Sequence, residues 1–307
     1  MLFSTILVIA LVGYFLYQKR PKFLGTKVDY SFGNVELQKI KAKIDEGEYT
    51  SAEFLIQQLD SDELHQVIDH VTLNGTGDPL LRWKEELPNS QIADLFLGIY
   101  YLHYATLNRG NDFNPKLSNK QEDLFFEYAE QATELLETID HDDVINAEAY
   151  ARLIRILGLT DDYKGAQYFF DKCMQINPHH LWAHIEYAEL TQPKWGVDLA
   201  TTNQFIDDLT DEPLVNQVIY LKLVWDSVLS QQNLFGGTLA DLKQQAKALL
   251  FEIDAEVNNT PPTSIQKYVL YNYMTVVSEE FGIKALNQKY NKLMNGNFTL
   301  YPFGIMK

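Results

Sequence analysis

Two histidines in the middle of the chain have the spacing of metal ligands. His180 and His184 are four residues apart, so a helix would place both imidazoles on one face, as zinc ligands require. A helical metalloprotease motif needs a glutamate directly after the first histidine, and Leu181 stands there instead. Glu186 and Glu189 are the carboxylates close enough in sequence to complete a site. A metal-dependent hydrolase that uses His180 and His184 is therefore one hypothesis, and a polar helix start is the simpler one.

The other reactive groups have simpler interpretations. The single cysteine, Cys173, excludes an internal disulfide, and it would need a basic neighbour to act as a nucleophile. The acidic run 140–143 lacks the ligand spacing of a calcium loop and suits the start of a helix. The glycines at 75–77 and 236–237 are not followed by the lysine and hydroxyl of a phosphate loop. We therefore predict no catalytic residue, no metal ion and no cofactor, and a protein that is not an enzyme.

Charge narrows the classes of partner. The chain has 307 residues, with 42 aspartates and glutamates against 25 lysines and arginines, for a net charge of −17. Nucleic-acid binding needs a basic face that attracts phosphates, so this composition excludes a nucleic-acid-binding body. An acidic surface favours a protein partner with a basic surface and steers its approach.

The first twenty residues have the pattern of a transmembrane anchor. Residues 2–17 carry no charge, and as a helix they reach roughly across a ~30 Å hydrocarbon core. Tyrosines at the end of this run suit the membrane interface, and basic residues follow it directly. A cleaved signal peptide, the alternative, has its basic residues before the apolar run. The residues assigned to the anchor are Leu2, Ile6, Ile9, Tyr14, Leu16, Tyr17, Lys19 and Arg20.

Basic residues also predict the orientation, because they mark the cytoplasmic side of a span. Within the first 28 residues, all of the basic residues come after the apolar run. We therefore predict a single-pass protein of the inner (cytoplasmic) membrane, with its N-terminus outside and its body in the cytoplasm. A periplasmic body is the alternative topology. Residues 21–33 would form a basic juxtamembrane linker.

Residues 34–294 have the pattern of an all-α body. Apolar residues recur at three- and four-residue spacing, as in the stripe within 64–71, and no stretch alternates as a half-buried strand would. The segments 118–121 and 238–241 have the spacing of capping boxes. This pattern predicts roughly a dozen helices of ordinary length. Residues 295–307 are apolar and contain proline and glycine, so we expect a tail that docks on the body or on a partner.

The segment 147–180 carries a repeat pattern. Large residues lie on its first helix, small ones on its second, and a proline ends it. This order resembles the tetratricopeptide repeat (TPR), in which two helices approach closely where the small residues lie. The residues expected to make this packing, here and in the neighbouring unit, are Tyr150, Leu153, Ala166, Phe170, Cys173, Pro178, Leu97, Gly98 and Tyr101.

A longer series of residues is similar to a family of membrane-anchored bacterial TPR-like proteins of unassigned function. The resemblance implies an α-solenoid of helical hairpins after a single transmembrane helix, and it supplies no activity. The residues that carry it are Leu80-Leu81-Arg82-Trp83, Pro88, Tyr104-Ala105, Arg109-Gly110 and Pro193-Lys194-Trp195-Gly196.

An α-solenoid offers an extended surface that binds peptides or proteins. The first hypothesis is a non-enzymatic, membrane-tethered module that binds a basic protein partner through this surface. An immunity or antitoxin-like inhibitor of a toxin that acts near the membrane is the alternative. Aromatic side chains are typical of such interfaces. The candidates for the interaction surface are Tyr104, Trp195, Tyr268 and Tyr271.

Overall fold

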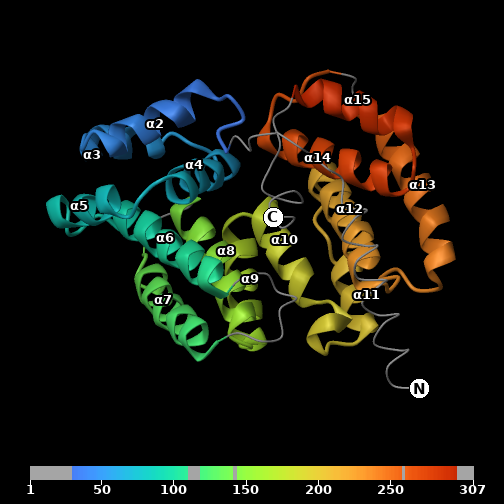
Figure 1. The fold of residues 1–307 in the computed structure, drawn as a ribbon, viewed down its shortest axis with the longest axis horizontal. Helices are drawn as coiled ribbons and strands as arrows, with labels where there is room; N and C mark the ends of the chain where they lie inside the picture. Colours follow the sequence, from blue (N-terminus) through green and yellow to red (C-terminus); the bar gives the residue numbers. More distant parts are fainter. Residues whose placement is uncertain (1–29, 110–117, 141–143, 258–259, 296–307) are drawn as a thin grey trace.

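The computed structural model describes residues 30–109, 118–140, 144–257 and 260–295. These ranges form fourteen α-helices and one short 3-10 helix, and they contain no strand, so the predicted all-α fold is confirmed. The helices of Figure 1 are α2 (Val35–Asp45), α3 (Tyr49–Ile56), α4 (Ser61–Asn74), α5 (Asp78–Glu86), α6 (Gln91–Arg109), α7 (Asn119–Glu137), α8 (Val144–Leu159), α9 (Tyr163–Ile176), α10 (Leu181–Leu190), η1 (Pro193–Trp195), α11 (Leu199–Asp207), α12 (Pro213–Ser230), α13 (Leu239–Glu256), α14 (Ile265–Glu280) and α15 (Lys284–Met294).

Several helix starts are fixed by local side chains. The capping boxes predicted at Ser118–Gln121 and Thr238–Asp241 both form, at the starts of α7 and α13. In each, the hydroxyl accepts a backbone N–H from the first turn while the polar side chain accepts the N–H of the capping residue. Asp60 caps α4 in a related way, by accepting two N–H groups of its first turn. These caps satisfy donors that a helix cannot pair internally.

The helices pack as antiparallel hairpins whose inner members close a ring. Helix α6 pairs with α7, α8 with α9, and α14 with α15. Helix α4 packs on α8, α8 on α10, α10 on α12, α12 on α14, and α14 returns to α4. These five inner helices occupy the middle of Figure 1, with α2, α3, α5 and α7 on one side and α13 and α15 on the other. An open solenoid would leave this inner face as a groove, whereas here α4 meets α14 of the last described hairpin.

Glycine permits one of the close helix approaches. A Cβ atom at Gly98 would lie 3.0 Å from Cγ of Leu136, so the side chain of Leu136 on α7 would have to shift to accommodate it. In the α8–α9 hairpin, Ala166 and Cys173 are fully buried. Among the residues assigned to repeat packing, Leu97, Gly98, Leu153, Ala166 and Cys173 are buried, Tyr101, Tyr150 and Phe170 are half-buried, and Pro178 is exposed.

The predicted membrane localisation requires a correction. No helix among the described residues is both long and apolar enough to cross a membrane, so the single-pass inner-membrane assignment, with either topology, is not supported. The physical reason is that even the longest described helices, α6 and α7, mix polar and charged residues with apolar ones along their 19 residues. The proposed anchor (1–20), with Leu2, Ile6, Ile9, Tyr14, Leu16, Tyr17, Lys19 and Arg20, lies outside the described residues, as does the tail 296–307.

Candidate functional site

The histidines considered as metal ligands bond to the backbone instead. His180 caps α10, and its Nδ1 accepts the N–H of Ala183 at 3.2 Å. His184 lies one turn later, and its Nε2 donates to the carbonyl oxygen of Pro178 at 2.9 Å. Burial lowers the pKa of His184 to about 4, so its imidazole is neutral at neutral pH. In the ranges that the structure describes, no group of three or more His, Cys, Asp or Glu side chains is placed to hold a metal ion.

Cys173 is placed as a packing residue. Its side chain is fully buried, and its Sγ lies 3.4 Å from the carbonyl oxygen of Ala147 on the paired helix α8. Burial, with the negative charge of Glu148 as a smaller cause, raises the pKa of the Cys173 thiol well above its ordinary value. A nucleophilic cysteine needs the opposite change, because the thiolate is the reactive form.

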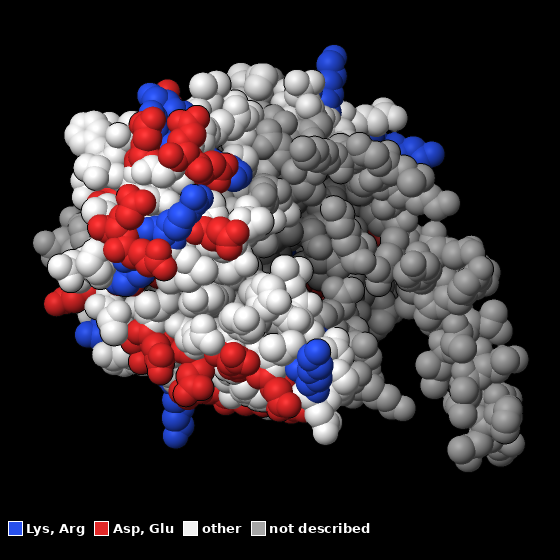
Figure 2. Space-filling view, turned by 60° about the vertical axis from the view of Figure 1, so that its left-hand side comes forward, with Lys and Arg blue, Asp and Glu red and all other residues white. Residues whose placement is uncertain are grey.

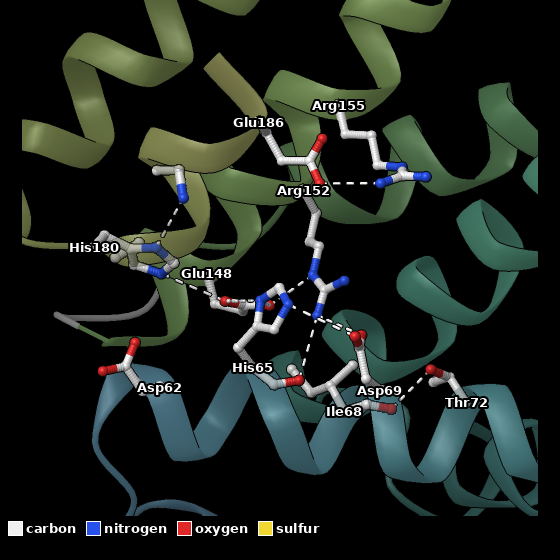
Figure 3. Close-up of polar contacts among 12 residues, drawn as sticks. Asp62, His65, Ile68, Asp69, Thr72, Glu148, Arg152, Arg155, His180 and Glu186 are labelled. Atoms are coloured by element: carbon white, nitrogen blue, oxygen red, sulfur yellow. Dashed lines mark hydrogen bonds and ion pairs between the residues drawn. The ribbon is translucent and has the colours of Figure 1, made fainter. Parts of the chain in front are cut away.

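A buried ionic network joins α4, α8 and α10 (Figure 3). At its centre is Glu148, whose side chain is completely excluded from solvent. Its carboxylate accepts hydrogen bonds from Nε of Arg152 at 2.6 Å and from Nδ1 of His65 at 2.9 Å. Nε2 of His180 faces the second carboxylate oxygen at 3.4 Å. One carboxylate on α8 therefore gathers polar groups from three helices.

Asp69 is the second carboxylate of the network. Nη2 of Arg152 donates to it at 2.8 Å, so the guanidinium bridges Asp69 and Glu148. Nε2 atoms of His65 and His103 lie 3.7 Å and 3.6 Å from the Asp69 oxygens. The ring of His65 also stacks on Trp182 of α10, with ring centroids 4.1 Å apart.

The charges of this network follow from its burial. Burial alone would raise the pKa of Glu148, but the interactions with His65 and Arg152 and the hydrogen bonds from the imidazoles hold that pKa well below its ordinary value. Burial and the nearby Arg152 lower the pKa of His65, and burial lowers that of His103 to about 3. At neutral pH the network therefore holds two carboxylates, one guanidinium, and neutral rings at these two histidines. A substrate could not reach it, since His65, Asp69, Glu148 and Arg152 are each at most 6% exposed. The network is a clamp between helices rather than a catalytic centre.

A second buried ionic cluster joins α10 to α12. The ammonium of Lys222 bonds to Glu189 at 2.8 Å and to Asp226, while the side-chain amide of Gln192 donates to Asp226 at 2.6 Å. Burial opposes the charge on Lys222, but Asp226 and Glu189 hold its pKa well above its ordinary value. The amine therefore stays protonated and cannot act as a nucleophile.

The outer face of α6 and α7 carries an aromatic group, which we call the tyrosine cluster: the exposed Tyr104 and the half-buried Tyr100, Tyr101 and Tyr128. The rings of Tyr104 and Tyr128 meet edge to face with centroids 4.5 Å apart, and Tyr101 lies 5.7 Å from Tyr128. Tyr104 is 38% exposed, and the neighbouring Leu107 is 73% exposed. Burial raises the pKa of Tyr101 and Tyr128, so both hydroxyls remain donors.

Beside this cluster, α7 presents a row of carboxylates to solvent. Its exposed acidic residues fall three or four positions apart, which places them on one face of the helix. Among the described residues these carboxylates have no ion-pair partner. Figure 2 turns this side of the molecule toward the viewer and shows acidic side chains outnumbering basic ones there. The row consists of Asp123, Glu127, Glu130, Glu134 and Glu137.

The four residues predicted to form an interaction surface are not brought together. Tyr104 is exposed in the tyrosine cluster, and Trp195 is partly exposed in η1 beneath the ammonium of Lys194. Tyr268 is half-buried on α14. Tyr271 was wrongly predicted, because it is fully buried and packs against Tyr290 of α15 with ring centroids 4.8 Å apart.

Comparisons with protein-family models, curated proteins and solved structures gave no match for this chain. A functional proposal therefore depends on the geometry of the chain itself. The sequence analysis missed the ionic network, although a signal for it exists. His65 and Asp69 interrupt an apolar stripe with a four-residue spacing, and Glu148 and Arg152 do the same.

Replacing Arg152 with methionine will test the clamp. The change leaves Glu148 and Asp69 buried without their cation, so we expect the free energy of unfolding to fall by about 3–5 kcal/mol. Urea denaturation followed by circular dichroism measures it. Arg155→Met is the matched control, because Arg155 lies one turn away and pairs at 3.0 Å with the partly exposed Glu186. The free energy of unfolding of Arg155→Met should fall by about 1 kcal/mol or less. Equal losses in the two variants would contradict a special role for Arg152.

Asp62, at the start of α4, gives a pH-dependent test. Burial raises its pKa to about 6, with the charge of His180 opposing the rise. Because the folded-state pKa exceeds the unfolded value of about 3.9, this residue contributes most stability below about pH 4 and loses it as the pH rises through 6. Asp62→Asn should therefore be more stable than the wild type at pH 7.5, on the order of 1 kcal/mol, and equal to it near pH 4. Thermal unfolding across this range measures the difference. Asp171→Asn, at an exposed carboxylate on α9, should show no such trend.

Proposed function

We propose that this chain is a non-enzymatic, TPR-like helical-repeat module that binds a protein partner with a basic surface. The helical hairpins support the architectural part of this proposal, in particular α8 and α9 with Ala166 and Cys173 at their contact. The side chains of Glu148 and Lys222 are buried, so the surface that a partner can contact is formed by other residues.

The observation that carries the proposal is the outer face of α6 and α7. Tyr104 is exposed there, and the other tyrosines of the cluster are half-buried around it. Tyrosines offer large contact area with a hydroxyl at the edge, and they are enriched in the centres of protein interfaces. Within the part of the chain that the structure describes, the adjacent carboxylate row has no ion-pair partner, so a basic partner would supply one. Lysine or arginine side chains could also stack on the tyrosine rings. In contrast, the inner face that an open solenoid would use is closed by the α4–α14 contact.

A defined peptide tests this surface. The probe is a fluorescein-labelled, amphipathic helical peptide of lysine, leucine and alanine, and the measurement is fluorescence anisotropy at two salt concentrations. We expect Tyr104→Ala to weaken binding about tenfold, as truncation of an interface tyrosine typically does. The double variant Glu127→Gln/Glu130→Gln should weaken binding and flatten its salt dependence.

Tyr168→Ala is the matched control. Tyr168 is 55% exposed on α9 and lies outside the tyrosine cluster, so its truncation should leave the affinity unchanged. Circular dichroism of each variant shows that the fold is retained. The proposal fails if the wild type does not bind the peptide, or if the two tyrosine variants lose affinity equally.

A further inference from the structure

Buried polar side chains are concentrated on one set of helices. Among the described residues, no buried polar or charged side chain lies on the outer helices α2, α3, α5, α7, α9, α13 or α15. Most of them lie on the inner helices or at their ends: His65, Gln66, Asp69 and Thr72 for α4; Glu148 and Arg152 for α8; His180, His184, Thr191 and Gln192 for α10; Gln217, Lys222, Asp226 and Ser227 for α12; and Asn272, Thr275 and Ser278 for α14. Buried polar groups are costly unless they are hydrogen-bonded, so a face that carries them tolerates contact with water or a polar ligand better than an apolar face would.

The ring closes at its least extensive contact. Of the five contacts in the circuit, the one between α14 and α4 joins the fewest residues. One polar link there is a hydrogen bond between the side chains of Asp62 and Gln266. The rest of the closure comes from the segment just before α2.

A short turn before α2 bridges the two halves of the ring. Phe32 is 5% exposed and belongs to the apolar cluster of the C-terminal helices, although α2 itself belongs to the N-terminal cluster. Its ring stacks on Tyr268 of α14, with centroids 4.7 Å apart and planes 7° from parallel. On the other side, the amide of Gln66 on α4 donates to the carbonyl oxygen of Tyr30.

The backbone of this turn is strained. Phe32 has a φ of +51°, in the left-handed region that a phenylalanine rarely adopts, and Gly33 follows with +72°. Such a conformation is unfavourable for a phenylalanine and persists only where surrounding contacts impose it. The hydroxyl of Ser31 supplies one such contact by accepting from Gln38 at 3.0 Å. The stacked ring of Phe32 supplies another.

We infer that the turn Tyr30–Asn34 is an internal latch, and that its release separates α14 from α4 and uncovers a second binding surface. The latch itself indicates what this surface accepts. The socket holds a phenyl ring against Tyr268, and the adjoining amide of Gln66 takes a backbone carbonyl. The ligand is therefore a peptide segment that carries one aromatic side chain and adopts a similar turn, and it replaces the latch in the open ring. This surface is separate from the tyrosine cluster, so the inference stands independently of the proposed function.

Hydrogen–deuterium exchange tests the latch. In Phe32→Asn the ring is removed, while asparagine still tolerates the left-handed backbone. We expect amide exchange to accelerate tenfold or more in peptides from α4 and α14, and to stay unchanged in α7. Tyr268→Ala, which removes the other ring of the stack, should give the same pattern, and the double variant should add little to either. Phe54→Asn is the control, because Phe54 is 66% exposed on α3.

A peptide with the sequence of residues 28–34 tests the ligand. Added to Phe32→Asn, it should restore the protection of α14, whereas a scrambled peptide should not, and the wild type should respond to neither. Unchanged exchange in Phe32→Asn, or an increase spread evenly over all helices, would overturn the latch. Normal opening without any effect of the peptide would overturn the second binding surface. Neither result depends on binding at Tyr104.

Discussion

The buried carboxylate of Glu148 is the interaction on which the arrangement of the inner helices depends. It is excluded from water, and it accepts from Arg152 on its own helix and from His65 on α4, while His180 faces it from the start of α10. An unpaired charge in such a place would be very costly, so these helices can approach only in the arrangement that supplies every donor. The network thereby favours one packing over the many that apolar contacts alone would allow.

The specific packing of the inner helices also determines which surfaces of the molecule can bind a partner. The inner face of the ring is occupied by the chain's own polar side chains. The carboxylates of α7, which have no ion-pair partner among the described residues, lie on the outer face. There the tyrosine cluster and the carboxylate row lie side by side on α6 and α7. Apolar area and uncompensated charge together distinguish this face from an ordinary solvated helix surface.

Local features of the fold were predictable, and long-range ones were not. The capping boxes at Ser118 and Thr238 formed as predicted because each cap involves residues only three positions apart. The role of His180 could not be predicted from the sequence, because its partner Glu148 lies on another helix. The prediction that Tyr271 lies on the surface was wrong for the same reason, because α15 and the ring of Tyr290 cover α14. Periodicity shows that a face is apolar or aromatic, but the neighbouring helices decide whether it is covered.

Closure of the ring makes the stability of each end of the chain depend on the other end. In an open array each hairpin touches its neighbours only, so folding can start anywhere and ends can fray independently. Here α4 touches α14, near the opposite end of the described chain, and Phe32 lies in the C-terminal apolar cluster. The two ends therefore gain or lose their contacts together. A cut or deletion at one end would therefore destabilise the helices at the other end. The module would unfold more as one cooperative unit than as a series of repeats.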